Sequence, residues 1–182
     1  MGILAEPLAM VQALPLPKGF AVCELGDQWV TCELPHRLAR ELYEDMGCKR
    51  YESIDANGRG SITFDLNRKW HGKTAQFDLV TDFGTTEHIF NQAEVWRTIH
   101  VLTKRHGFIA FDKPSQGYVD HGFFNVHETM LRDLAAANRW RVVTLQRDTS
   151  NRGELLRGVF QKMHETKFLA PQQGRYQKAL KV

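Results

Sequence analysis

The sequence predicts an α/β protein whose doubly wound, mostly parallel sheet is covered by helices on both faces, giving three layers. Short apolar segments of strand length alternate along the chain with segments whose apolar residues recur at helical spacing. Acidic residues directly follow several of the expected strands. The length of 182 residues suits one domain with a buried core.

The composition narrows the classes of function. Hydrophobic residues make up 42% and charged residues 25%, an ordinary balance for a soluble globular protein. The formal net charge is +3, and the basic residues are scattered, so a nucleic-acid partner is not expected. Three cysteines without a C-x-x-C pair predict neither a disulfide framework nor a zinc site, which favours a reducing, cytoplasmic location.

The N-terminal residues 1–18 are expected to form an irregular arm, because Pro7, Pro15 and Pro17 oppose regular structure. The same prolines and Glu6 interrupt its apolar residues, so no signal peptide or membrane span is expected. The α/β domain is expected over residues 19–165, followed by a tail over residues 166–182.

The expected strands are short apolar runs, most of them closed by glycine or acidic residues. They lie at Phe20–Leu25, Tyr51–Asp55, Ile62–Leu66, Phe77–Asp82, Phe108–Asp112, Arg141–Gln146 and Leu155–Met163. The last segment is ambiguous, since its apolar residues also have helical spacing. Its β-branched and aromatic content and the alternating order of the fold favour a strand.

Helices are expected where apolar residues recur every three or four positions, at about Pro35–Met46, Thr86–Lys104 and Glu128–Asn138. Pro35 suits a first helical turn, and Gly47 and Gly107 stand where the first two helices would end. Residues 113–126 are rich in glycine, proline and aromatic side chains and are expected to form a loop.

Acidic residues mark the carboxyl ends of four expected strands. In doubly wound sheets, ligands bind beyond these ends, where the strand order reverses. The residues in question are Glu24-Leu25-Gly26-Asp27, Asp55, Asp65 and Asp82. Each aspartate alone is compatible with an ordinary turn. Carboxylates grouped at one edge repel one another, so the ordered set indicates a polar, partly cationic ligand.

This ordered set resembles the motifs of the class I methyltransferases. Ala21–Gly26 resembles the first motif, an apolar strand that ends in an acidic residue and glycine. Ser53–Asp55 is similar to the segment whose acidic residue holds the ribose hydroxyls, and Phe64–Leu66 to the segment whose Asp contacts the adenine amino group. Phe77–Gly84 resembles the fourth motif, at the substrate end of the cofactor.

Further segments extend the resemblance over most of residues 20–165. Thr103–Ile109 resembles the segment that leads into the fifth strand. A closer likeness is to a subgroup with Gly-Thr-x-Glu-His after the fourth strand and His-Gly-Phe-Phe after the fifth. Here these motifs are residues 84–88 and 121–124. The tail residues 168–176 also resemble that subgroup.

The resemblance implies a Rossmann-like class I methyltransferase fold and S-adenosylmethionine as cofactor. The residues implied in cofactor binding are Glu24, Gly26, Asp27, Asp55, Ala56, Asp65, Leu66, Asp82 and Phe83. The implied acceptor of the methyl group is a small molecule or a sugar-like group, recognised by the N-terminal arm and the loop at 113–126.

Gly26 stands nearly alone where relatives carry two or three glycines, followed by Asp27, Gln28 and bulky Trp29. A second hypothesis therefore stays open, a catalytically inactive methyltransferase-like protein with a binding or structural role. A nicotinamide-binding Rossmann protein is disfavoured, because G-x-G-x-x-G is absent after the first strand.

Asp82, His88 and His121 are the candidates for catalysis, together with nearby Glu87, and Tyr118 and Phe123 are candidate walls of the site. A base is needed only where the acceptor carries a proton. A position in the first turn of a helix would lower the pKa of His88 and favour the neutral imidazole that a base requires. A cap or a tether for a loop is the alternative role for such a histidine.

No metal site is expected. Asp82, His88, His121 and His127 are possible ligands, but no pair among them has the tight spacing of a dedicated site. The expected partner is a small-molecule substrate. A homo-oligomer stays possible, and a membrane partner is not expected.

Overall fold

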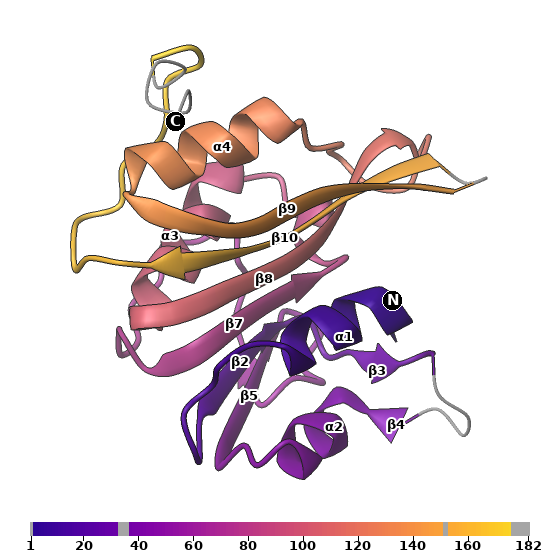
Figure 1. Ribbon diagram of the computed structural model, residues 1–182, viewed down its shortest axis with the longest axis vertical. Coiled ribbons are helices and arrows are strands. Elements are labelled where there is room, and N and C mark those ends of the chain that lie inside the picture. The colour runs from indigo at the N-terminus through magenta and orange to yellow at the C-terminus, as the bar shows by residue number, and fades with distance from the viewer. Residues whose placement is uncertain (1, 33–36, 151–152, 176–182) are drawn as a thin grey trace.

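The computed structural model describes residues 2–32, 37–150 and 153–175. Among them a seven-stranded sheet runs through the middle of the molecule in the order β6-β5-β2-β7-β8-β10-β9 (Figure 1). The strands are β2 (Ala21–Leu25), β5 (Arg50–Asp55), β6 (Ile62–Thr63), β7 (Phe77–Phe83), β8 (Thr103–Gly117), β9 (Trp140–Ser150) and β10 (Gly153–Lys162).

The first five strands of that order are parallel, and β10 lies antiparallel between β8 and β9. The prediction of a doubly wound, mostly parallel sheet is therefore confirmed. Leu155–Met163, ambiguous in the sequence, lies in strand β10 apart from its last residue, so the choice of a strand was correct.

Helices cover the sheet on both faces. The helices α1 (Ala5–Gln12) and α2 (Ala39–Asp45) pack in one core cluster, and α3 (Gln92–Leu102) and α4 (Glu128–Ala137) in the other. Neighbouring residues of β8 divide between the clusters, since Phe108 and Ala110 join the first, and Ile109 and Phe111 the second. Burial on both faces explains why this strand reads as a continuous apolar run.

The N-terminal arm is not irregular, which corrects the prediction for residues 1–18. Pro7 lies in the first turn of α1, where backbone N–H groups have no partner within the helix and proline costs little. The other two prolines follow the end of the helix. Leu8 and Val11 of α1 are buried in the core, so the helix packs against the domain.

A second, three-stranded sheet was not predicted. It consists of β1 (Gly2–Ile3), β3 (Trp29–Val30) and β4 (Arg37–Leu38), with β1 and β3 parallel and β3 and β4 antiparallel. The backbone N–H of Thr31 also donates to the Ile3 carbonyl at 3.0 Å. This sheet holds the first residues of the chain beside the segment that follows β2.

The long helix predicted at Thr86–Lys104 is divided in two. A 3-10 turn, η1 (Thr86–His88), comes first, and Ile89 after it is extended. The helix α3 begins behind Asn91, whose side chain accepts a hydrogen bond from the Glu94 N–H. Because of this local cap, the helix starts later than the spacing of the apolar residues predicted. At its other end, the helix is followed directly by β8, which begins at Thr103.

Three other predicted boundaries also move. The helix predicted at Pro35–Met46 is the shorter α2, and its predicted start lies in residues 33–36, outside the described residues. The strand predicted at Ile62–Leu66 ends at Thr63. The predicted loop 113–126 begins as strand, because β8 continues to Gly117 and pairs with β10. In the described part of the chain, no helix is long and apolar enough to cross a membrane.

Candidate active site

The strand order reverses between β2 and β7. From β2 the chain proceeds outward through β5 and β6, and it then returns to β7 and β8 on the other side. The hydroxyl of Thr85, just beyond β7, donates to the carbonyl of Leu25 at 2.7 Å and so connects the two carboxyl ends. Ligands of doubly wound sheets bind at this point, and the predicted residues Gly26 and Phe83 border it.

Asp27 and Asp55 lie together at the ends of β2 and β5. One carboxylate oxygen of Asp55 accepts the N–H of Asp27 at 3.3 Å, and the other accepts the N–H of Asn57 at 2.9 Å. Ala56 lies in the turn between Asp55 and Asn57. Each Asp55 oxygen therefore keeps a lone pair for a further donor.

Asp65 lies in the turn after β6 rather than in a strand. Its carboxylate accepts the backbone and side-chain N–H groups of Asn67, and these bonds hold the pKa of Asp65 below its usual range. Asn67 in turn accepts the N–H of Asn91, ahead of α3. Leu66 beside them is a buried core residue. The hydrogen bonds of Asp65 thus serve this turn.

Glu24 is fully buried at the end of β2. Its Oε2 accepts the Tyr51 hydroxyl at 2.6 Å and the Gln28 N–H at 3.1 Å, whereas Oε1 has no hydrogen-bond partner within the described residues. Burial raises the pKa of Glu24 to about 8. Burial therefore favours the protonated form of this carboxyl group.

The space in front of Gly26 is filled by two polar side chains. Gly26 has a positive φ of 80°, and a Cβ on it would stand 2.7 Å from Nε2 of Gln28. That amide donates to the Thr85 hydroxyl at 2.8 Å. The Gln28 Oε1 is buried and lacks a hydrogen-bond partner in the described segments. The first motif of the family that this segment resembles has two or three glycines. Here Gly26 is the only glycine at this place, and the Gln28–Thr85 pair lies in front of it.

A buried ionic cluster joins β7, β8 and η1. The ammonium group of Lys113 lies 2.5 Å from Asp82 Oδ2 and 3.1 Å from Glu87 Oε2, and each of the three side chains is 1% exposed. Asp82 also accepts the N–H and the hydroxyl of Thr86. Asp82, predicted to act in catalysis and cofactor binding, is therefore placed inside an ion pair that holds η1 against the sheet.

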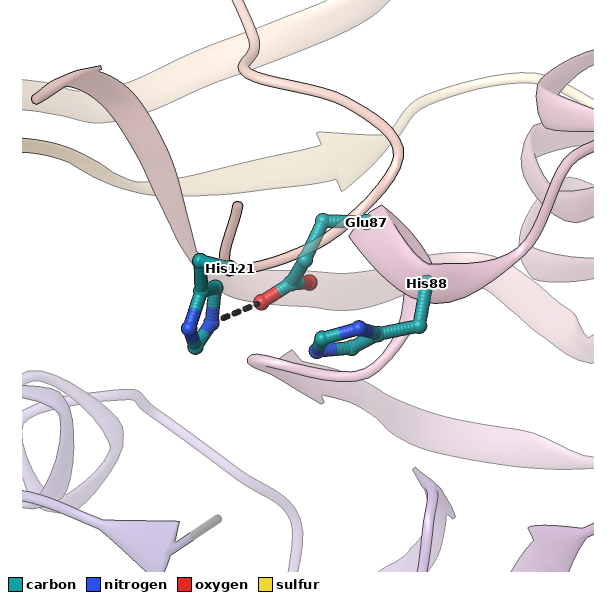
Figure 2. Close-up of side chains that lie close together, drawn as sticks. All are labelled: Glu87, His88 and His121. Carbon is teal, nitrogen blue, oxygen red and sulfur yellow. Dashed lines mark ion pairs between the residues drawn. The ribbon is translucent and has the colours of Figure 1, made fainter. Parts of the chain in front are cut away.

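Glu87, His88 and His121 approach one another beside this cluster (Figure 2). His121 Nε2 lies 3.6 Å from Glu87 Oε1, and the two imidazole centroids are 5.1 Å apart. The two histidines come from η1 and from the loop after β8. The backbone N–H groups of Phe123 and Phe124 donate to the Glu87 carbonyl, which joins these two segments.

Burial lowers the pKa of His88, which favours its neutral form. The direction agrees with the sequence prediction, but the main cause is desolvation rather than a helix dipole. Gly122 permits the close packing, because a Cβ there would lie 3.2 Å from His88 Nδ1.

A pocket of about 210 Å³ opens next to His121 and Glu87. Its wall combines the N-terminal segment with the ends of β7 and β8 and the start of the following loop. The lining residues are Gly2, Leu4, Pro7, Thr31, Phe83, Gly84, Glu87, Asp112, Pro114, Tyr118, His121 and Leu155. The two segments expected to recognise the acceptor thus meet in one pocket. Tyr118 is a wall as predicted, whereas Phe123 is not among the lining residues and is exposed.

Sequence reasoning missed Gln28, Thr85, Lys113 and Asp112. For Lys113 a signal was present, because it stands two residues beyond Phe111 and four beyond Ile109, and so on the same face of the strand as these core residues. The predicted loop ended the strand too early to use it. Gln28 and Thr85 carried no such signal, since a contact between residues 57 positions apart has no local pattern.

Comparison of the sequence with protein-family models and with curated proteins finds no match. Solved structures do match. One is the 1,6-didemethyltoxoflavin-N1-methyltransferase of Burkholderia thailandensis, with bound S-adenosylhomocysteine, at 19% identity and a TM-score of 0.62 over 88% of this chain and 78% of that one. The chain has the class I methyltransferase fold.

Two further structures agree. A putative methyltransferase from Bacillus halodurans matches with a TM-score of 0.65 at 10% identity, over 87% of this chain and 98% of that one. The N-methyltransferase NodS of Bradyrhizobium japonicum, in complex with S-adenosylhomocysteine, matches with a TM-score of 0.62 at 15% identity, over 87% of each chain. At identities of 19% and below, these likenesses show the fold alone.

Replacing Lys113 with methionine should destabilise the protein by about 3–5 kcal/mol, because it leaves Asp82 and Glu87 buried without a counter-charge. Urea unfolding at neutral pH measures the loss. The control is Lys104→Met, whose partly exposed pair with Asp78 should be worth less than about 1 kcal/mol. Equal losses in the two variants would mean that water reaches the Lys113 cluster.

Replacing Glu24 with glutamine should flatten the pH dependence of stability. Between the ordinary pKa of 4.5 and the folded value of about 8, the folded protein binds more protons than the unfolded chain. The free energy of unfolding of the parent should therefore fall as the pH rises through this range. Glutamine does not titrate, so unfolding measured from pH 5 to 8 should fall less in the variant.

The control for this experiment is Glu44→Gln, at an exposed position of α2. Its free energy of unfolding should fall with rising pH as steeply as that of the parent. If Glu24→Gln and the parent lose stability equally with rising pH, Glu24 does not titrate in this range.

Proposed function

We propose that the protein is an S-adenosylmethionine-dependent methyltransferase that acts on a small-molecule or sugar-like acceptor. The observation that carries the proposal is the pairing of two sites at one edge of the sheet. Acidic residues gather at the ends of β2 and β5, and a separate pocket lies beyond the ends of β7 and β8. Methyl transfer needs both a cofactor and an acceptor held in line.

The residues at the first site suit the cofactor. Asp55 keeps lone pairs for the ribose hydroxyls, and the unpartnered oxygens of Glu24 and Gln28 are acceptors for the ammonium group of the amino acid end. The remaining proposed contacts are Gly26, Asp27, Ala56, Asp65, Leu66, Asp82 and Phe83. The bound cofactor supplies an electrophilic methyl group on a sulfonium centre.

Binding at Gly26 requires the Gln28 side chain to turn away from Thr85, since the two occupy the approach to the glycine. Turning out of the site gives the buried Gln28 amide access to water or to the ligand. A cationic ligand beside Glu24 favours its ionised form, so ligand binding should release the proton that burial holds there.

In the acceptor pocket, we assign His121 and His88 the removal of a proton from the acceptor, because His121 lines the pocket and His88 lies against it. Asp82 acts as a positioning residue through Lys113, which holds Glu87 in turn. The contact of Glu87 with Phe123 and Phe124 supports the resemblance to the subgroup that carries both motifs.

An inactive, binding or structural protein is the second candidate, and the occupied space in front of Gly26 is the observation that favours it. A cytoplasmic location is part of the proposal. It is supported by Cys23, Cys32 and Cys48, all of them free thiols.

Titration calorimetry with S-adenosylhomocysteine separates the two candidates. The parent should bind one molecule per chain, and Asp55→Ala should weaken binding by about 10- to 150-fold, through the loss of charged hydrogen bonds to the ribose. Asp45→Ala, at the exposed end of α2, should bind like the parent. The absence of heat at millimolar ligand would refute cofactor binding and favour the inactive protein. Unchanged affinity of Asp55→Ala would refute the ribose contact.

A further inference from the structure

Glu87, His88 and His121 each offer one potential ligand atom, and these three atoms lie within 4.8 Å of one another (Figure 2). Two imidazole nitrogens and one carboxylate oxygen are a ligand set that zinc and related divalent ions accept at catalytic sites. The possible ligands named from the sequence included Asp82 and His127 and did not include Glu87, so this set of three residues was missed. Asp82 is bound to Lys113, and His127 lies beside a different pocket, at the start of α4.

The charge at this place is unbalanced. Asp82, Glu87 and Lys113 are 1% exposed and together carry one net negative charge when ionised. Burying an unpaired charge is costly, so the cluster favours a further cation. Lys113 binds the Oε2 atom of Glu87, which leaves the Oε1 atom facing the histidines.

His88 provides the second, independent observation. Its Nε2 atom is buried and has no hydrogen-bond partner in the described parts of the chain. A buried ring nitrogen without a partner costs free energy that coordination would recover.

The surroundings fix the orientation of Glu87. Lys113 holds one carboxylate oxygen at 3.1 Å, and the N–H groups of Phe123 and Phe124 hold the backbone carbonyl of the residue. Partners behind the ligands of a metal site orient those ligands and increase affinity. His121 is the most accessible of the three residues, with 35% of its side chain exposed at the pocket.

We propose that Glu87, His88 and His121 bind a divalent transition-metal ion of the zinc class, with its fourth position open to the acceptor pocket. Ligand atoms around a tetrahedral zinc ion stand about 3.4 Å apart. Closure therefore needs an inward movement of about 1 Å, which the exposed His121 can make. With the ion bound, the coordinating nitrogens of His88 and His121 no longer act as bases. An acceptor hydroxyl or a water molecule in the open position becomes more acidic instead, and its proton passes to solvent. The site does not depend on the proposed methyl transfer.

The test is a titration of chelator-treated parent protein with Zn²⁺ by calorimetry and with Co²⁺ by visible absorption. We expect one ion per chain with a Kd of about 1 μM or below, and intense Co²⁺ bands typical of tetrahedral coordination. His88→Ala, His121→Ala and Glu87→Gln should each weaken binding by at least about 10-fold. Circular dichroism of each variant verifies that it is folded.

The matched control is His127→Ala, which removes an exposed histidine at the start of α4 and should bind as the parent does. Absence of a one-to-one Zn²⁺ complex at 100 μM metal (about 5.5 kcal/mol) would overturn the proposal. Equal affinity of the parent and folded His88→Ala or His121→Ala would overturn it as well, because the ion would then lie elsewhere. S-adenosylhomocysteine binding, measured separately, tests the proposed function and is not affected by either outcome.

Discussion

The ion pair of Lys113 with Asp82 and Glu87 is the interaction on which the functional edge of the sheet depends. Each partner comes from a different element, since Asp82 lies near the end of β7, directly before Phe83, Glu87 in η1 and Lys113 within β8. Removal of these charges from water is costly, and their mutual contact and the hydrogen bonds to Thr86 offset the loss of hydration. The cluster therefore fixes η1 and the two strand ends relative to one another.

The consequences of this constraint extend to both binding regions. Because η1 is fixed, the Glu87 carbonyl holds the loop that carries His121, and that loop forms one side of the pocket proposed for the acceptor. On the other side of η1, Thr85 reaches back to Leu25 and closes the reversal point between β2 and β7. One buried cluster thus connects the pocket to the place where the cofactor is proposed to bind.

The sequence was sufficient for the parallel sheet, because β2, β7 and β8 are buried on both faces and read as apolar runs closed by polar residues. It was also sufficient to group Asp27 and Asp55 at one edge of the sheet, since parallel strands end at the same edge, and the structure brings these two residues into contact. It failed where a local cap opposes periodicity, as at Asn91, and where a proline in a first turn is harmless, as at Pro7. The Gln28–Thr85 contact and the Lys113 cluster arise from tertiary packing, which no local pattern records.

The most direct test is a crystal structure of the protein grown with saturating S-adenosylhomocysteine. The ligand should lie across the carboxyl ends of β2 and β5, with its ribose hydroxyls on Asp55, and the Gln28 amide should have left the Thr85 hydroxyl. A structure in which the Gln28–Thr85 bond persists and the ligand is absent from Asp55 would contradict a cofactor site at this edge of the sheet.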